Sequence, residues 1–165
     1  MTSARQNARN AVAQWLTDGN VDGIDKIWTV WPLRLDFANF SASVHRCQVV
    51  VVIESENEIR IALGGAHSGK KRIDYLVTLE VYHSSTTDVP QEALDNYDVV
   101  IDGIKARLRA DRMAGETDDS IVWQMGEGPF GIQTEFLIPD NWQVGGEPIE
   151  FYGRIRFEVT QWITS

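Results

Sequence analysis

Hydrophobic and polar residues alternate most regularly in the middle and at the end of the chain. Between residues 73 and 83, and again between residues 149 and 163, apolar side chains recur at every second position over long stretches. Successive side chains of a strand point to opposite faces, so this period of two predicts two long strands, each with one face toward a core. Gly153 interrupts the apolar face of the last strand and indicates a bulge or a close backbone approach.

A longer period, close to 3.6 residues, predicts two helices. The first covers residues 3–18, with Ser3 as its cap and Gly19 at its end. The second covers residues 90–112 and starts with Pro90, which suits the first turn of a helix. The apolar stripes are expected to be Ala8, Ala11, Val12, Trp15 and Leu16 in the first helix, and Leu94, Tyr97, Val100, Ile101, Ile104 and Leu108 in the second.

Shorter segments complete the expected sheet, and one pair of them predicts a hairpin. Pro32 restricts the segment at residues 27–35 to an edge or a bend. The segment at residues 44–54 contains an unbroken apolar run typical of a strand covered on both faces. A polar turn at residues 55–58 is expected to lead from it into the segment at residues 59–63. The expected extended segments are residues 27–35, 44–54, 59–63, 121–125 and 130–138.

Together these elements predict an α+β fold. We expect a mainly antiparallel sheet of about six or seven strands with two α-helices packed on it. No linker or internal repeat divides the sequence, so residues 1–165 are expected to form a single compact domain. The Gly-rich basic segment at residues 64–72 is expected to be a flexible loop.

Composition and charge narrow the classes of protein. The net charge of −9 and the pI of about 4.7 argue against a free-standing nucleic-acid-binding protein, which needs a basic face. The single cysteine, Cys47, excludes an intrachain disulfide and is expected to be a small core residue. No apolar stretch approaches the roughly 20 residues of a membrane span, and the polar N-terminus lacks a signal peptide's apolar core, so we expect assembly in a cytoplasm.

One segment is similar to a phosphate-binding loop. Residues 64–71 have a glycine, four residues and then Gly69-Lys70, but Lys71 occupies the position that needs a Mg²⁺-binding hydroxyl. The following residues have a period of two, so no helix N-terminus is expected to face a phosphate. A loop between strands, or a basic arm that docks on an acidic face of a neighbouring subunit, explains the segment better.

Other candidate chemistry is incomplete in the sequence. His45, His67 and His83 share no metal-ligand spacing, and one cysteine cannot complete a zinc site. Cys47 with a histidine partner would need a third, orienting group that the sequence does not select. Acidic residues on the second helix are typical of a solvated face. We therefore expect no catalytic residues, no metal site and no cofactor, and we expect that the protein is not an enzyme.

The order of the elements, and several local motifs, resemble the tail terminator (minor tail, or tail-completion) proteins of long-tailed bacteriophages and related neck proteins. The similar order is a helix, a short extended segment, a strand pair, a Gly/Lys loop, a long strand, a long helix and a final strand, and it covers nearly the whole chain. The segments that resemble the family are Ala8-x-x-Ala11-Val12-x-x-Trp15-Leu16, residues 72–83, residues 96–109, residues 123–132, and residues 156–163 with Phe157-Glu158-Val159-Thr160.

The resemblance implies a structural virion protein that forms a ring, expected to be a hexamer, on the end of the tail tube. Such a ring ends tube elongation and joins the tail to the head connector, while DNA passes through its centre without specific binding. Its partners would be copies of itself, the tail-tube protein and the head–tail connector proteins. Its location would be the head–tail junction of the virion, after assembly in the bacterial host cytoplasm. The family has no catalytic residues.

A ring needs two different, complementary patches on each subunit. We predict that Lys70, Lys71 and Arg72 form one patch, and that Asp95, Asp98 and Asp102 form its partner on the next subunit. Trp28, Trp31 and Trp142 lie in irregular segments and are further candidates for interface anchors, although core burial is their commoner fate.

Three alternatives to a terminator remain open at the level of sequence. The first is another virion role, as a head–tail connector or a tail-tube subunit. The second is a small-ligand or nucleotide-binding domain that uses residues 64–71. The third is a hydrolase with a carboxylate or Cys47 centre, for which the sequence supplies no ordered set of residues.

Overall fold

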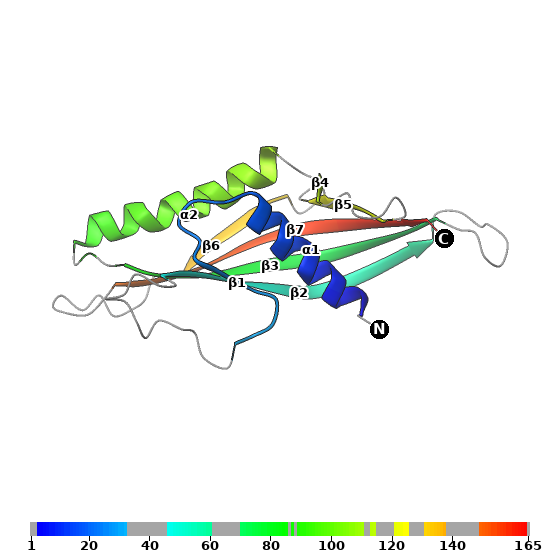
Figure 1. Ribbon diagram of the computed structural model, residues 1–165, viewed down its shortest axis with the longest axis horizontal. Helices are drawn as coiled ribbons and strands as arrows, with labels where there is room; N and C mark the ends of the chain where they lie inside the picture. The colour runs from blue at the N-terminus through cyan, green and yellow to red at the C-terminus, as the bar shows by residue number, and fades with distance from the viewer. Residues whose placement is uncertain are drawn as a thin grey trace.

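The computed structural model describes residues 3–32, 46–60, 70–85, 87, 89–110, 113–114, 121–125, 131–137 and 149–164. Two helices and one sheet make up this part of the chain (Figure 1). The helices are α1 (Ala4–Asp18) and α2 (Pro90–Ala110). The strands are β1 (Lys26–Trp28), β2 (Cys47–Arg60), β3 (Lys70–Ser84), β4 (Met113–Ala114), β5 (Ile121–Met125), β6 (Gln133–Leu137) and β7 (Glu150–Thr164).

The sheet is open and mixed, with the strand order β1-β2-β3-β7-β5-β4, and β6 also pairs with β7. β5 pairs with residues 159–163 of β7, and β6 pairs with residues 152–156. β1 is parallel to β2, whereas the other pairs are antiparallel. The predicted α+β class with two helices is confirmed. The predicted six or seven strands slightly exceed the five principal strands, because β1 and β4 are only short edge pieces of three and two residues.

The predicted hairpin at residues 55–58 is wrong. β2 continues through this segment to Arg60, and it stays paired with β3 across a register shift between Ile53 and Ser55. No glycine or proline stands in the segment to reverse the chain, and a bulge absorbs the irregularity instead. The seven residues after Ile53 are exposed, so their polar character reflects solvent exposure rather than a turn.

The expected loop at residues 64–72 is also shorter than predicted at its C-terminal end. β3 begins at Lys70, and Lys71 and Arg72 pair with residues of both β2 and β7. Residues 64–69 lie outside the described residues. A strand, not a helix, therefore follows the segment that is similar to a phosphate-binding loop, as the period of two predicted.

Both helices begin and end for local reasons. The Ser3 side chain accepts a hydrogen bond from the backbone N–H of Gln6, and Gly19 caps the end of α1, as the sequence predicted. In α2 the described end is Ala110, and the buried stripe contains most of the expected residues. Leu94 is only partly buried, and Ala93 takes a fully buried place in the stripe.

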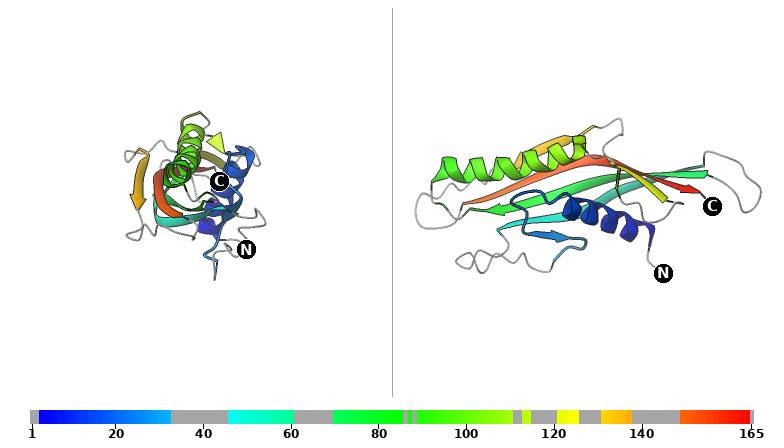
Figure 2. Two further views of the ribbon diagram at one scale, coloured as in Figure 1. Left: turned by 90° about the vertical axis from the view of Figure 1, so that its left-hand side faces the viewer. Right: turned by 45° about the horizontal axis from the view of Figure 1, so that its top comes forward.

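The two helices cover the same face of the sheet. Tyr97 of α2 stacks on Phe151 of β7 with ring centroids 5.1 Å apart, and Trp15 of α1 lies 6.5 Å from Phe157 of β7. Phe151 and Phe157 are an even number of residues apart, so they share one face of the strand. The end-on view in Figure 2 shows the sheet curving around the helices. The opposite side of β2, β3 and β7 is called the helix-free face below.

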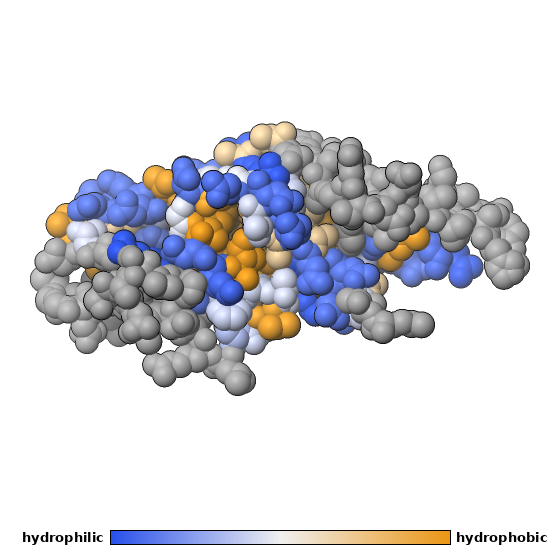
Figure 3. Space-filling view, in the orientation of Figure 1, coloured by the Kyte–Doolittle hydropathy of each residue, from blue (hydrophilic) through white to orange (hydrophobic). Residues whose placement is uncertain are grey.

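A turn after α1 fixes the two helices relative to one another. A Cβ at Gly103 of α2 would crowd Val21, and a Cβ at Gly23 would crowd Val100. Gly23 also has a φ of 87°, which favours glycine. In Figure 3 apolar atoms show through between the helices on this otherwise mostly hydrophilic face. The close backbone approach explains why small residues stand at these positions.

Among the described residues, no helix is long and apolar enough to cross a membrane.

Candidate functional site

The long helix α2 presents an exposed acidic surface, which we call the acidic stripe. Asp95, Asp98 and Asp102 are all exposed. Asp95 accepts a hydrogen bond from Gln91, and Asp102 pairs with Lys105 at 3.1 Å. These residues are three and four positions apart, so they lie along one side of the helix, as the sequence predicted. The stripe is turned away from the core stripe of α2 and is accessible to a partner.

The basic run Lys70, Lys71 and Arg72 is divided by the strand that contains it. Lys71 pairs with Glu58 at 3.1 Å, while Arg72 pairs with Asp74 at 2.7 Å and lies 5.7 Å above the Trp162 ring. Neighbouring residues of a strand point to opposite faces, so Lys71 and Arg72 cannot form a single patch. The side chain of Lys70 lies outside the described part of the chain. Of the predicted group, Arg72 lies on the helix-free face.

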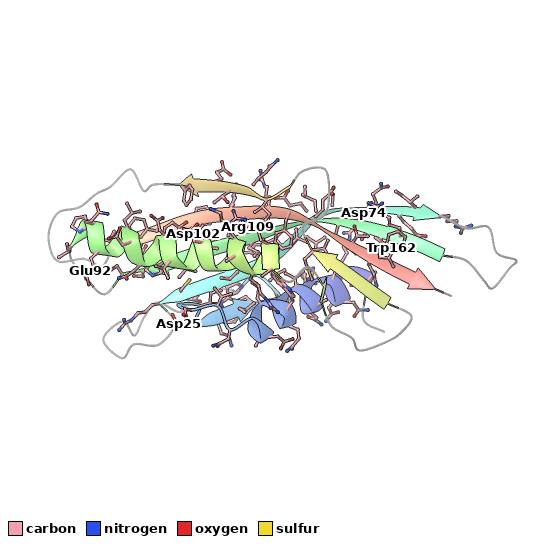
Figure 4. All side chains as sticks on the ribbon, turned by 90° about the horizontal axis from the view of Figure 1, so that it is seen from above. Asp25, Asp74, Glu92, Asp102, Arg109 and Trp162 are labelled. Atoms are coloured by element: carbon pink, nitrogen blue, oxygen red, sulfur yellow. The ribbon has the colours of Figure 1, made fainter. Side chains whose placement is uncertain are left out.

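The two predicted surfaces lie toward opposite ends of an elongated molecule. In Figure 4 the α2 residues Glu92 and Asp102 lie toward one end, and Asp74 and Trp162, next to Arg72, lie toward the other. The chain therefore does not bring the acidic stripe and the basic run together. Any contact between them must involve two copies of the chain.

The helix-free face carries a polar network that was not predicted from the sequence. Glu80 accepts hydrogen bonds from Tyr82 and from Tyr152, and it forms an ion pair with Arg154 at 3.2 Å. Arg154 also lies 4.0 Å from Glu135. Only 9% of the Glu80 side chain is exposed, and this burial is possible because its oxygens have partners. The sequence did show that Glu80 and Arg154 face outward from two strands. It could not show that they meet, because this depends on how β3 and β7 are aligned.

A second set of contacts extends this network along the same face. Glu54 accepts hydrogen bonds from Thr78 at 2.6 Å and from Arg156 at 3.2 Å. Asp74 accepts from Thr160 at 2.7 Å in addition to Arg72. The residues that take part are Glu54 in β2, Asp74, Thr78, Glu80 and Tyr82 in β3, and Tyr152, Arg154, Arg156 and Thr160 in β7. These contacts link the three central strands across the helix-free face, and the three carboxylates are matched by Arg72, Arg154 and Arg156.

Burial also shifts the pKa values of several groups on this face. The pKa of Glu158 is raised, first by burial and then by the nearby charge of Asp74, although Arg72 opposes the shift. The pKa of Tyr82 is raised by burial and by Glu80. The phenol therefore remains protonated at neutral pH and can donate to Glu80, as the hydrogen bond requires.

Cys47 lies opposite His83 in the β2–β3 pairing, and the Asp25 carboxylate bonds the Cys47 backbone and interacts electrostatically with His83. The Asp25 carboxylate accepts a hydrogen bond of 2.7 Å from the Cys47 backbone N–H, not from the thiol. Burial raises the pKa of the fully buried Cys47 thiol to about 12, and burial lowers the pKa of His83. A thiol that stays protonated is a poor nucleophile, so Cys47 is a core residue, as expected.

The remaining candidates from the sequence are separated or lie outside the described residues. Trp28 is partly buried and donates to Gln48 at 3.0 Å, whereas Trp31 is 56% exposed. Trp142, His45 and His67 lie outside the described residues. Within the described ranges, no group of three or more His, Cys, Asp or Glu side chains is arranged to hold a metal ion.

Comparison with models of known protein families finds no match, and comparison with curated proteins finds no significant similarity.

Proposed function

We propose that this protein is a structural subunit of a phage tail, which assembles with copies of itself into a ring that caps the tail tube. The ring would end tube elongation and join the tail to the head connector, with DNA passing through the centre. The proposal begins from the resemblance of the element order to tail terminator proteins.

The observation that best supports it is the placement of two different surfaces toward opposite ends of one subunit. The acidic stripe lies toward one end and the Arg72–Trp162 region toward the other (Figure 4). A contact between two different patches repeats from copy to copy, and it closes into a ring when its rotation divides a full turn. An isologous dimer through the acidic stripe alone is disfavoured, because the stripe of one copy repels that of the other.

The charge of the chain is suited to a channel for DNA. Each subunit has a net charge of −9, so a ring of several copies would be strongly negative. A negative wall repels the phosphate backbone and lets DNA slide without specific contacts. In this proposal the protein surrounds DNA without binding it, so it does not need the basic face of a nucleic-acid-binding protein.

The direct test is the mass of the isolated protein, measured by light scattering over a concentration series with negative-stain images of the same samples. Closed rings of about six subunits are the expected result. Filaments would instead indicate a tail-tube subunit, which must stack on itself. In a second experiment the protein is added to tail-tube subunits of the same virus while they polymerise. If the protein caps the tube, tube growth should stop.

Thermal unfolding with Mg²⁺-nucleotide tests the ligand-binding alternative. A nucleotide at 100 times its Kd would stabilise the folded protein by about 2.7 kcal/mol. We expect no such shift, because the segment similar to a phosphate-binding loop leads into a strand. A clear shift together with a protein that stays monomeric would overturn the structural proposal.

A further inference from the structure

Three side chains form a row across the end of the helix-free face. Ile59 in β2, Arg72 in β3 and Trp162 in β7 are register partners, so they lie side by side on three neighbouring strands. Ile59 is 41% exposed, and the Arg72 side chain is 36% exposed. Strands are spaced about 4.8 Å apart, so the row is about 10 Å long. It combines apolar surface with one guanidinium group.

A complementary row lies on the exposed side of α2. Val99 is 59% exposed and lies among the carboxylates of the acidic stripe. Asp95 precedes it by four residues and Asp102 follows it by three, so both carboxylates flank it on the same side. Seven residues of helix extend over about 10 Å, close to the length of the row on the sheet.

We propose that these two rows are the two halves of one contact between copies of this chain. Val99 of one copy packs against Ile59 and Trp162 of the next, and Asp95 and Asp102 lie beside Arg72. This inference rests on the proposed ring, and it replaces the basic run of three residues by a mixed row centred on Arg72. It also names Val99, Ile59 and Trp162 as the apolar residues of the contact, which the charge pattern alone did not identify.

The chemistry of Arg72 allows it to serve both its own strand and a partner. Asp74 takes the Nε–H at 2.7 Å, and a guanidinium carries five N–H donors. The Trp162 ring centroid lies 5.7 Å from the guanidinium carbon, within the range of a cation–π contact. Tryptophan and arginine are the residue types most often found at the energetic centre of an interface. Lys71 faces the other side of the sheet and is not part of this contact.

The two rows lie toward opposite ends of the molecule in Figure 4. An antiparallel dimer would use both rows on one neighbour, and a double cysteine variant of such a dimer would stop at a covalent dimer, which would overturn the proposal. In the head-to-tail arrangement that we propose, each copy offers one row to the copy before it and the other to the copy after it. This is the pattern that produces rings or open filaments.

Cysteine cross-linking tests the contact directly. Ile59→Cys and Val99→Cys are introduced separately and together, and the samples are oxidised and analysed by non-reducing electrophoresis. The native Cys47 is fully buried and should not compete. A mixture of the two single variants should give one cross-linked dimer, and the double variant should give a ladder of covalent oligomers, because a disulfide forms only when Cβ atoms come within about 4.5 Å.

A matched control places the first cysteine at Val30, which is 62% exposed but belongs to the segment after β1. Val30→Cys mixed with Val99→Cys should give little cross-linked dimer. Cross-links within one single variant, Val99 to Val99 or Ile59 to Ile59, would show an isologous contact and overturn the proposal. Rings without the mixed cross-link would refute this contact while the ring function stands. A monomer that gives no cross-links at any concentration and also fails to stop tube growth would refute both.

Discussion

At the scale of the residue, Gly153 shows how a packed side chain determines which residue a neighbouring position can hold. It lies inside β7, three residues after the strand begins, and glycine is unfavourable within a strand. Its pairing with Val81 is regular, so the alternative of a bulge does not apply. A Cβ at this position would overlap the Tyr97 hydroxyl of α2, which lies against the strand backbone. Glycine is therefore present because the helix approaches the sheet closely, one of the two explanations that the sequence left open.

Gly153→Ala should lower the free energy of unfolding by about 1–3 kcal/mol, because the added methyl group forces the packed ring of Tyr97 to move. Tyr97→Phe in the same protein should restore most of the loss, since it removes the atom that the methyl group meets. Urea unfolding of the two single variants and the double variant measures this coupling. Additive losses would mean that another contact, such as the backbone oxygen of Glu135, is limiting.

His83 gives the protein a predictable dependence on pH. Burial lowers the pKa of His83 below its ordinary value of 6.5, with Asp25 opposing the shift and Arg46 adding to it. The unfolded chain therefore binds a proton more readily than the folded protein. Stability is full above pH 6.5 and falls as the pH drops below it.

The free energy of unfolding should therefore be lower at pH 5.5 than at pH 7.5, and His83→Phe should reduce this difference. Urea titrations of both proteins at constant ionic strength measure it. Glu158 has the opposite effect, because its raised pKa makes it stabilise the fold at low pH and lose that contribution as the pH rises. Equal pH dependence in the two proteins would contradict the role of His83.

At the scale of the element, α2 combines two faces with different tasks. Ile104 is fully buried in the core stripe, and Val99 is exposed on the acidic side of the same helix. Because both residues are β-branched, they have similarly low intrinsic helix propensity. Their environments, not their local preferences, should decide how much each contributes to folding.

Ile104→Ala should lower the free energy of unfolding by about 2–5 kcal/mol, through lost apolar burial and the cavity left behind. Val99→Ala is the matched control, and it should change the stability of the monomer by less than about 0.5 kcal/mol. Chemical denaturation of monomeric samples compares them. A large loss for Val99→Ala in the monomer would mean that this residue serves the fold rather than a contact between copies.

At the scale of the whole molecule, charge and shape act together. The acidic stripe and the Arg72 row are separated along the long axis, so they can meet only between copies (Figure 4). Such a contact adds to the ion pairs that Arg72 and Asp102 already form with Asp74 and Lys105 in their own chain. Exposed charges are screened by salt, with a Debye length of about 8 Å at physiological ionic strength. Assembly driven partly by these charges must weaken as salt is added.

Replacing Asp95, Asp98 and Asp102 with Asn should weaken ring formation at least tenfold and reduce its dependence on salt. The control replaces three exposed acids elsewhere, Asp18, Asp22 and Glu150, with their amides, so that both variants have the same net charge. Light scattering from 50 to 500 mM salt, over a concentration series, compares them. Equal weakening in both variants would show that only the net charge matters.

The sequence by itself determined the local elements and the inward faces of the long ones. Periods of two and 3.6 residues placed β3, β7, α1 and α2 within a few residues, and the Ser3 cap and most of the α2 core stripe were predicted correctly. Such features depend on residues close together in the chain, where side-chain direction follows directly from the backbone period.

The tertiary structure alone decided the features that depend on pairing between distant residues. β2 continues past its polar segment because β3 lies beside it, and the basic run is divided because strand geometry sends Lys71 and Arg72 to opposite faces. The Glu80 network and the Ile59–Arg72–Trp162 row exist only in the observed register. Register is a property of several strands together, and a shift of one residue would turn each of these side chains to the other face.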